Sequence, residues 1–90
     1  MTGSVAREIE ILLQEAFLPT RLEVINDSAR HHGHSGDDGS GESHFSVEIV
    51  SERFAGMSRL ERQRAVNTPL ADLLRDRIHA LSIKARAPTE

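Results

Sequence analysis

The chain has no cysteine, tryptophan or tyrosine, and its 90 residues include only three phenylalanines. Without thiols it forms no disulfide framework, has no thiol nucleophile and offers no thiolate ligand to a metal. No apolar run approaches the ~20 residues that cross a bilayer, and the first residues lack the basic-then-apolar pattern of a signal peptide. We therefore expect one small cytosolic domain with no membrane partner, whose core depends on leucine, isoleucine and valine.

The formal net charge of −3 is unevenly distributed along the chain. Residues 1–58 contain four basic and ten acidic side chains, whereas residues 59–90 contain seven basic and four acidic ones. The C-terminal third is therefore positively charged and suited to an anionic partner. Ordinary solvated helix faces explain the same pattern, so charge alone does not decide between the two interpretations.

Hydrophobic periodicity in the first half predicts one helix and two strands. Apolar side chains from Val5 to Phe17 follow helical spacing, and Pro19 is expected to end that helix. Alternating apolar and polar residues predict strands over 21–25 and 44–51, which should pair antiparallel. These three elements would form the N-terminal part of the core.

The second half is predicted to contain two helices and a strand, over residues 58–67, 69–77 and 78–86. Ser58 and Glu61 have the spacing of a capping box, and Thr68 before Pro69 is typical of a helix start. The resulting order, α-β-β-α-α-β, indicates an α+β fold with helices on one side of a three-stranded sheet. We expect a single domain over 1–86 and a frayed tail over 87–90.

Residues 29–43 form a glycine-rich stretch that contains His31, His32 and His34. It is predicted to be a flexible loop, longer than a hairpin needs, and such loops are either functional or disordered. Imidazole nitrogens suit borderline metals, but a mobile tract of this kind lacks the fixed spacing of a structural metal site.

The remaining candidate residues give no enzyme signature. His44 opens the second strand and His79 falls on the apolar face of the last one, so both are expected to be structural, hydrogen-bonded histidines. The chain contains no nucleophile elbow, zinc-binding helix motif, Walker loop or dinucleotide fingerprint. We therefore predict that the protein is not an enzyme.

The predicted helix pair resembles a helix-turn-helix in outline, which makes nucleic-acid binding an alternative. Its helices are short and the chain lacks the aromatic residues that stack on bases. The candidate DNA-binding residues are basic and lie mostly on these helices: Arg59, Arg62, Arg64, Arg75, Arg77 and Lys84.

Several stretches, in order over nearly the whole chain, together resemble the BolA family. They cover residues 23–28, 41–45, 50–56, 62–67 and 78–83, the last with a characteristic histidine. The resemblance implies the αββααβ fold of that family, which is similar to the type II KH topology, with a mixed three-stranded sheet. One position departs from the family pattern, because Gln63 stands where the helix signature usually has histidine. Glutamine neither titrates nor ligates as imidazole does.

The resemblance also implies a function. Proteins of this family pair with monothiol glutaredoxins and share a bridging 2Fe–2S cluster, in iron–sulfur trafficking or iron-dependent regulation. Some bacterial members are described as DNA-binding transcriptional regulators. Because this chain has no cysteine, it would ligate one iron through histidine, while partner cysteine and glutathione thiolates hold the rest. The isolated chain is expected to hold no cofactor and to be a monomer or a weak homodimer.

The implied cluster ligands are histidines. His79 matches the family's histidine in the last strand and is the first choice. For the second ligand, His31 matches the family position in the loop, and His34 is the alternative.

Overall fold

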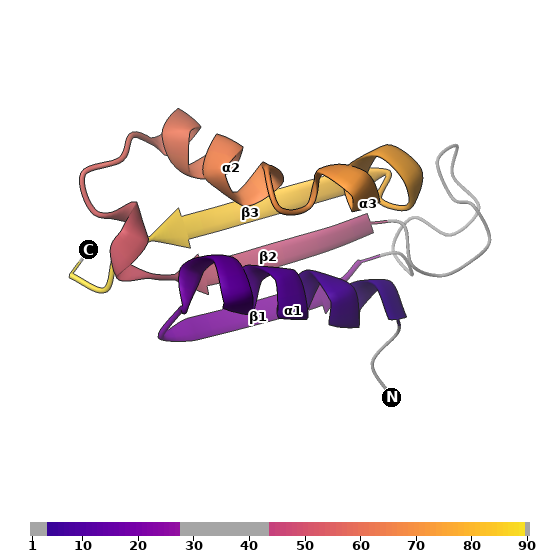
Figure 1. Cartoon of the computed structure of the whole chain (residues 1–90), viewed down its shortest axis with the longest axis horizontal. Helices are drawn as coiled ribbons and strands as arrows, with labels where there is room; N and C mark the ends of the chain where they lie inside the picture. The colour runs from indigo at the N-terminus through magenta and orange to yellow at the C-terminus, as the bar shows by residue number, and fades with distance from the viewer. Residues whose placement is uncertain (1–3, 28–43, 90) are drawn as a thin grey trace.

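The computed structural model describes residues 4–27 and 44–89, and these form a three-stranded sheet with helices along one face (Figure 1). The elements follow the predicted order, with a short 3₁₀ turn added after the second strand: α1 (Ser4–Phe17), β1 (Arg21–Asn26), β2 (His44–Val50), η2 (Glu52–Phe54), α2 (Arg59–Asn67), α3 (Ala71–Asp76) and β3 (Ala80–Arg86). The α+β class and the helical covering of one sheet face are therefore confirmed. None of the helices in the described part is long and apolar enough to span a membrane.

Helix α1 buries one apolar stripe and exposes its charged side chains. Val5, Ile9 and Leu13 are completely buried, and Phe17 is almost so. This spacing of four residues aligns them on one side of the helix, as the sequence predicted. The helix ends at Leu18, whose φ of 46° lies in the left-handed region and whose N–H donates to the Gln14 carbonyl. Pro19 follows and prevents further helix.

The sheet has the order β1-β2-β3 and mixes the two kinds of pairing. β1 is antiparallel to β2, with Leu22 opposite Ile49. β2 is parallel to β3, with His44 opposite Ala80 at one end and Val50 opposite Arg86 at the other. Parallel strands need a long connection, which here contains η2, α2 and α3. Both parallel strands consequently begin at the same end of the sheet.

The two faces of the sheet differ in polarity because side chains alternate along each strand. Phe45, Val47 and Ile49 of β2 point toward the helices and are at most 2% exposed. Ser46 and Glu48, on the opposite face, remain partly exposed. The core thus lies entirely on the helical side, and the other face is open to solvent.

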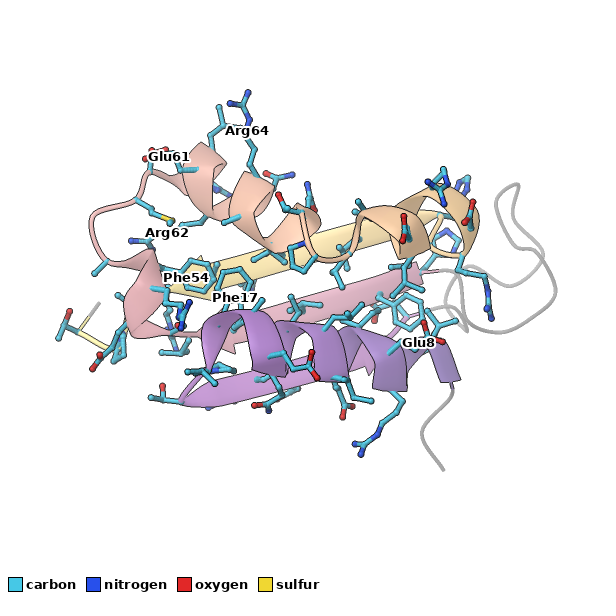
Figure 2. The ribbon with its side chains drawn as sticks, viewed as in Figure 1. Glu8, Phe17, Phe54, Glu61, Arg62 and Arg64 are labelled. Carbon is cyan, nitrogen blue, oxygen red and sulfur yellow. The ribbon has the colours of Figure 1, made fainter. Side chains whose placement is uncertain are left out.

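The connection between the parallel strands is fixed by polar caps and by one phenylalanine. Ser58 accepts a hydrogen bond from the Glu61 N–H, and the Glu61 carboxylate accepts one from the Ser58 N–H, so the predicted capping box is confirmed. Phe54 of η2 is fully buried, and its ring lies 4.9 Å from that of Phe17 (Figure 2). The buried Ser51 hydroxyl donates to the Phe17 carbonyl at 2.7 Å, which attaches this connection to α1.

Several predicted boundaries are wrong. Thr68 does not cap the third helix: it follows the last residue of α2, and its hydroxyl donates to the Arg64 carbonyl. That hydroxyl is therefore engaged with the preceding helix, and α3 begins at Ala71 without a side-chain cap. β3 begins at Ala80 rather than 78, and Ala87, assigned to a frayed tail, is only 2% exposed. The predicted loop over 29–43 lies outside the described residues.

Candidate functional site

Two histidines meet where β2 begins and β3 is about to begin. The ring centroids of His44 and His79 lie 5.3 Å apart, with the ring planes inclined by 50°. The parallel register explains this contact, because His44 is opposite Ala80 and His79 directly precedes Ala80. Residues 35 positions apart in the sequence are thus brought together by strand pairing.

The two imidazoles differ in exposure. His44 is only 8% exposed, whereas His79 is exposed. The prediction that His79 is a partly buried residue on the apolar face of the last strand is therefore wrong: it lies just outside β3, where strand alternation does not direct it into the core. The structure presents one accessible imidazole supported by a buried one.

Backbone contacts fix the position of His44. The Asp27 N–H donates to the His44 carbonyl at 2.7 Å, and the Ser46 hydroxyl donates to the Asp27 carboxylate. These bonds bring the last described residue after β1 to the first residue of β2. The segment that joins them carries His31, His32 and His34, which lie outside the described residues.

The sequence contains a signal that identifies His44. Alternation predicts strands over 44–51 and 78–86, but alternation alone does not set their register. A parallel pairing that aligns the starts of both strands would have put His44 next to His79. His44 is therefore the residue that sequence reasoning missed.

The chemistry of this pair suits partial ligation of a metal centre. Within residues 4–27 and 44–89, no group of three or more histidine, cysteine or carboxylate side chains is close enough to hold a metal ion. Two imidazoles supply at most two nitrogen ligands, and a tetrahedral site needs four. The described residues therefore fit a centre that is completed by ligands from elsewhere, and not a self-contained metal site.

The candidate DNA-binding residues differ in the contacts that they make. The Arg75 guanidinium donates to both carboxylate oxygens of Asp76 at 3.0 Å and lies 3.5 Å from an Asp72 oxygen. The hydrogen bonds with Asp76, and the charges of both carboxylates, raise the pKa of Arg75, while Arg75 lowers the pKa of Asp76. Arg75 is thus neutralised within its own helix.

Arg62 has a structural role. Its Nε donates to the Met57 carbonyl at 3.1 Å, and its Nη1 donates to the Ala85 carbonyl at 3.2 Å. The second bond joins α2 to the edge of β3, and the first joins the helix to the segment that precedes it. Arg59, Arg64 and Arg77 form no ion pair with a described residue, and Lys84 lies 4.0 Å from Glu48.

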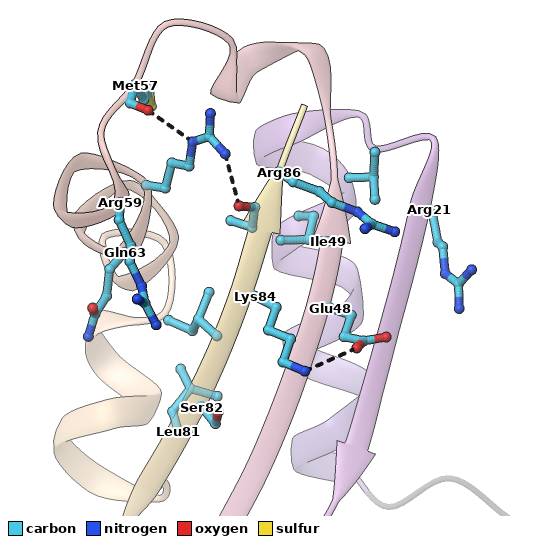
Figure 3. Close-up of a pocket in the computed structure, with 14 residues that line it drawn as sticks. Arg21, Glu48, Ile49, Met57, Arg59, Gln63, Leu81, Ser82, Lys84 and Arg86 are labelled. Atoms are coloured by element: carbon cyan, nitrogen blue, oxygen red, sulfur yellow. Dashed lines mark hydrogen bonds and ion pairs between the residues drawn. The ribbon is translucent and has the colours of Figure 1, made fainter. Parts of the chain in front are cut away.

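A cleft of about 820 Å³ lies between α2 and β3 and extends onto the open face of the sheet (Figure 3). Two of the candidate DNA-binding residues line it: Arg59, which forms no ion pair with a described residue, and Lys84, which lies 4.0 Å from Glu48. Gln63 lines it as well, which places the residue that departs from the family pattern away from the histidine pair. Arg64 points away from the sheet (Figure 2).

Comparison with known proteins places this geometry in a family. Residues 13–90 match the family model described as BolA-like protein. The chain is 53% identical to a Sinorhizobium protein described as an uncharacterized protein in the cobS 5′ region, over 97% of this chain and 95% of the relative. It is 49% identical to the DNA-binding transcriptional regulator BolA of Vibrio cholerae, over 83% of this chain and 67% of the relative.

A solved structure agrees with the sequence relationship. The BolA domain of SufE1 from Arabidopsis thaliana superposes with a TM-score of 0.89 at 38% identity, covering 99% of this chain and 98% of that chain. The order of elements, the mixed sheet and the helices on one face are therefore those of a known domain. Together with the family match over most of its length, this shows that the chain belongs to the BolA-like protein family.

Proposed function

We propose that this protein is an adaptor that forms a complex with a monothiol glutaredoxin and shares a bridging 2Fe–2S cluster with it. The observation that carries the proposal is the exposed imidazole of His79 beside the buried His44 at one end of the sheet. The complex would serve iron–sulfur cluster trafficking or iron-dependent regulation in the cytosol, and the chain itself would perform no turnover.

The residues of this chain would supply one side of the cluster site. His79 can donate an imidazole nitrogen to iron because its ring is accessible. A buried neighbour such as His44 restricts where that ring can lie, in the way that outer residues orient metal ligands. Thiolates must come from the glutaredoxin and glutathione, since the chain has no cysteine.

The second histidine ligand is proposed from two sources. His31 and His34 are the candidates from the family resemblance, and the chain joins them to this end of the sheet through Asp27 and His44. His44 is the candidate from geometry, because its ring is the neighbour of His79. A series of single alanine variants at these positions distinguishes them.

The test is a titration of the protein into a cluster-loaded monothiol glutaredoxin, followed by visible absorption and circular dichroism. We expect a spectral change that saturates at one-to-one stoichiometry and disappears in His79→Ala. The second ligand is the position among His31, His34 and His44 whose alanine variant also alters the spectrum. Arg64→Ala is the matched control, because Arg64 is exposed and lies on α2, outside the histidine pair.

Two results would contradict the proposal. An unchanged spectrum together with no complex in size-exclusion chromatography would exclude this partner. A normal mixed-ligand spectrum with His79→Ala would exclude the ligand assignment while leaving the partnership intact.

DNA binding is the second candidate function. It is supported by the 49% identity to a protein named as a DNA-binding transcriptional regulator, and by Arg59, Arg64 and Arg77, which form no ion pair with a described residue. Gel-shift titrations at increasing salt test it. Sequence-specific binding that weakens in Arg64→Ala would support regulation, whereas binding without sequence preference and with a steep loss at higher salt would indicate only a general electrostatic contact.

A further inference from the structure

Neither of the proposed functions uses the outer edge of β3, which lies beside several basic side chains. β3 is the last strand in the order β1-β2-β3, so one of its edges has no neighbouring strand among residues 4–27 and 44–89. The cleft between α2 and β3 runs along this edge from Leu81, which is opposite Phe45, to Arg86 at the far end of the strand. Neither His44 nor His79 lines it.

The hydrogen bonds of β3 show which backbone groups face this edge. The Arg86 carbonyl accepts from the Ser51 N–H, on the side of β2. The Ala85 carbonyl accepts from Arg62, on the outer side. Because successive residues of a strand direct their backbone groups to opposite edges, Leu81 and Ile83 present their N–H and C=O groups outward, as Ala85 does. No described residue supplies a partner to those two on the outer edge.

The charges around the edge are mainly positive. Five basic side chains line the cleft, and Glu48 is its single carboxylate. Arg62 is engaged with backbone carbonyls, and Lys84 is opposed by Glu48. Arg59 and Arg86 form no ion pair with a described residue, so their charges are available to a ligand.

These cations lie on both sides of the strand edge. Arg59 extends from α2 on one side of β3, and Arg86 lies over the open sheet face on the other (Figure 3). Arg21 lies on the same open face, since both Arg21 and Arg86 are opposite Val50 of β2. A strand added to β3 would direct alternate side chains toward these two sides.

We propose that the free edge of β3 binds an extended acidic peptide segment of a partner protein as a fourth strand. Backbone hydrogen bonds to Leu81 and Ile83 would supply the pairing, and carboxylates on the two faces of the peptide would meet Arg59 on one side and Arg86 on the other. Leu81 and Ile83 are partly exposed apolar residues, which gives the added strand a surface to cover.

The cleft suits a peptide better than single-stranded nucleic acid. Its lining contains no aromatic side chain on which a base could stack. Glu48 lies within it and would repel a phosphate backbone, whereas a peptide can place an uncharged residue there. The same positive charge thus favours discrete carboxylates over a continuous polyanion.

The experiment uses the full chain, without a glutaredoxin or a cluster, so its failure is independent of the proposed function. The probe is a capped seven-residue peptide of glutamate and threonine with carboxylates on both faces of an extended strand. Amide NMR spectra of the protein are recorded during titration. We expect the largest shifts at the amides of Leu81 and Ile83, and no change at Val24 of β1, on the other side of the sheet.

Two variants of the protein separate the cleft from general electrostatics. Arg59→Gln combined with Arg86→Gln is expected to weaken binding at least about tenfold, because two charge contacts are lost. Arg7→Gln combined with Arg64→Gln removes the same charge at exposed positions outside the cleft and is expected to change affinity less than about twofold.

A variant of the probe tests the pairing itself. A peptide with every backbone nitrogen methylated keeps its charges but cannot donate to β3, and it is expected to lose binding. Equal affinity for the methylated peptide, equal weakening in both double variants, or binding of oligothymidylate in preference to the acidic peptide would each overturn the proposal.

Discussion

The two ends of the parallel strand pair present different chemistry. Where β2 and β3 begin, two imidazoles lie together, one buried and one exposed. Where β3 ends, guanidinium groups surround a strand edge, and those not bonded within the fold remain exposed. An imidazole can give up its charge and so tolerates burial, whereas a guanidinium stays charged and needs water or a partner.

The two ends of the strand pair are stabilised by different interactions. The histidine end depends on the register of β2 and β3 and on the buried ring of His44. The arginine end depends on the bonds of Arg62 to backbone carbonyls and on the buried Phe54 of η2. Substitutions should therefore affect the two ends unequally, unless they unfold the whole domain.

The largest effect is expected from Phe54→Ala. Phe54 is fully buried against Phe17, and such truncations cost about 3–5 kcal/mol, which is much of the stability of a small domain. Urea unfolding monitored by NMR should show the amides of His79 and Ile83 losing native shifts at the same, lowered midpoint. Phe54→Leu, which keeps most of the volume, should cost less than about 1.5 kcal/mol. Separate midpoints for the two amides would show that the ends unfold independently.

The two histidines provide the next comparison. His44→Ala is expected to lower the free energy of unfolding by about 1–3 kcal/mol, because a buried polar side chain and its contacts are lost. His79→Ala removes an exposed ring and should change it by less than about 0.5 kcal/mol. Chemical denaturation of both variants measures the difference. Equal changes in the free energy of unfolding would mean that the burial of His44 does not make it more important for stability than His79.

Arg62→Met probes the attachment of the arginine end. The substitution keeps much of the apolar stem but removes the bonds to the Met57 and Ala85 carbonyls, at an expected cost of about 1–2 kcal/mol. Arg64→Met, at an exposed position of the same helix, should be nearly neutral. Hydrogen exchange should accelerate in α2 and at Lys84, whose N–H faces β2, but not at His44. Acceleration at both ends would argue against a local effect.

The smallest effect concerns the cap of α2 and depends on pH. Hydrogen bonds from the Ser58 backbone and side chain lower the pKa of Glu61. The ionised carboxylate therefore stabilises the fold above the pKa of the unfolded chain, and this contribution disappears as pH falls through the lower folded pKa. Wild type should exceed Glu61→Gln in stability at pH 7, and the difference should narrow as the falling pH protonates the Glu61 carboxylate. A difference in stability that persists at low pH would show that the ionised Glu61 carboxylate is not its cause.

The sequence predicted most elements of the fold but not every boundary. The stripe from Val5 to Phe17 and the capping box at Ser58 depend on local chemistry, and both were predicted correctly. Thr68 was misplaced because its hydroxyl can bond either forward or back, and only packing selects the bond to Arg64. The parallel pairing could be expected only from the family resemblance, since alternation within a strand does not reveal its partner.

The site was predictable to a lesser degree. His79 was identified through the family resemblance, whereas its exposure and its contact with His44 depend on where β3 starts and on register. The basic residues were identified by charge, but a sequence does not show which of them bond internally. Arg62 and Arg75 do so, and the cleft around β3 follows from the tertiary arrangement of α2.

The parallel register of β2 and β3 also has a consequence for the order of folding. His44 and His79 meet only when β3 has docked, and β3 is synthesised after the other elements described here. Contacts of such long sequence separation form late, because the intervening chain must first be closed into a loop. The histidine pair is consequently present only in completely folded molecules. A nascent or truncated chain that lacks β3 would not display it, so metal ligation at this end would be delayed until folding is finished.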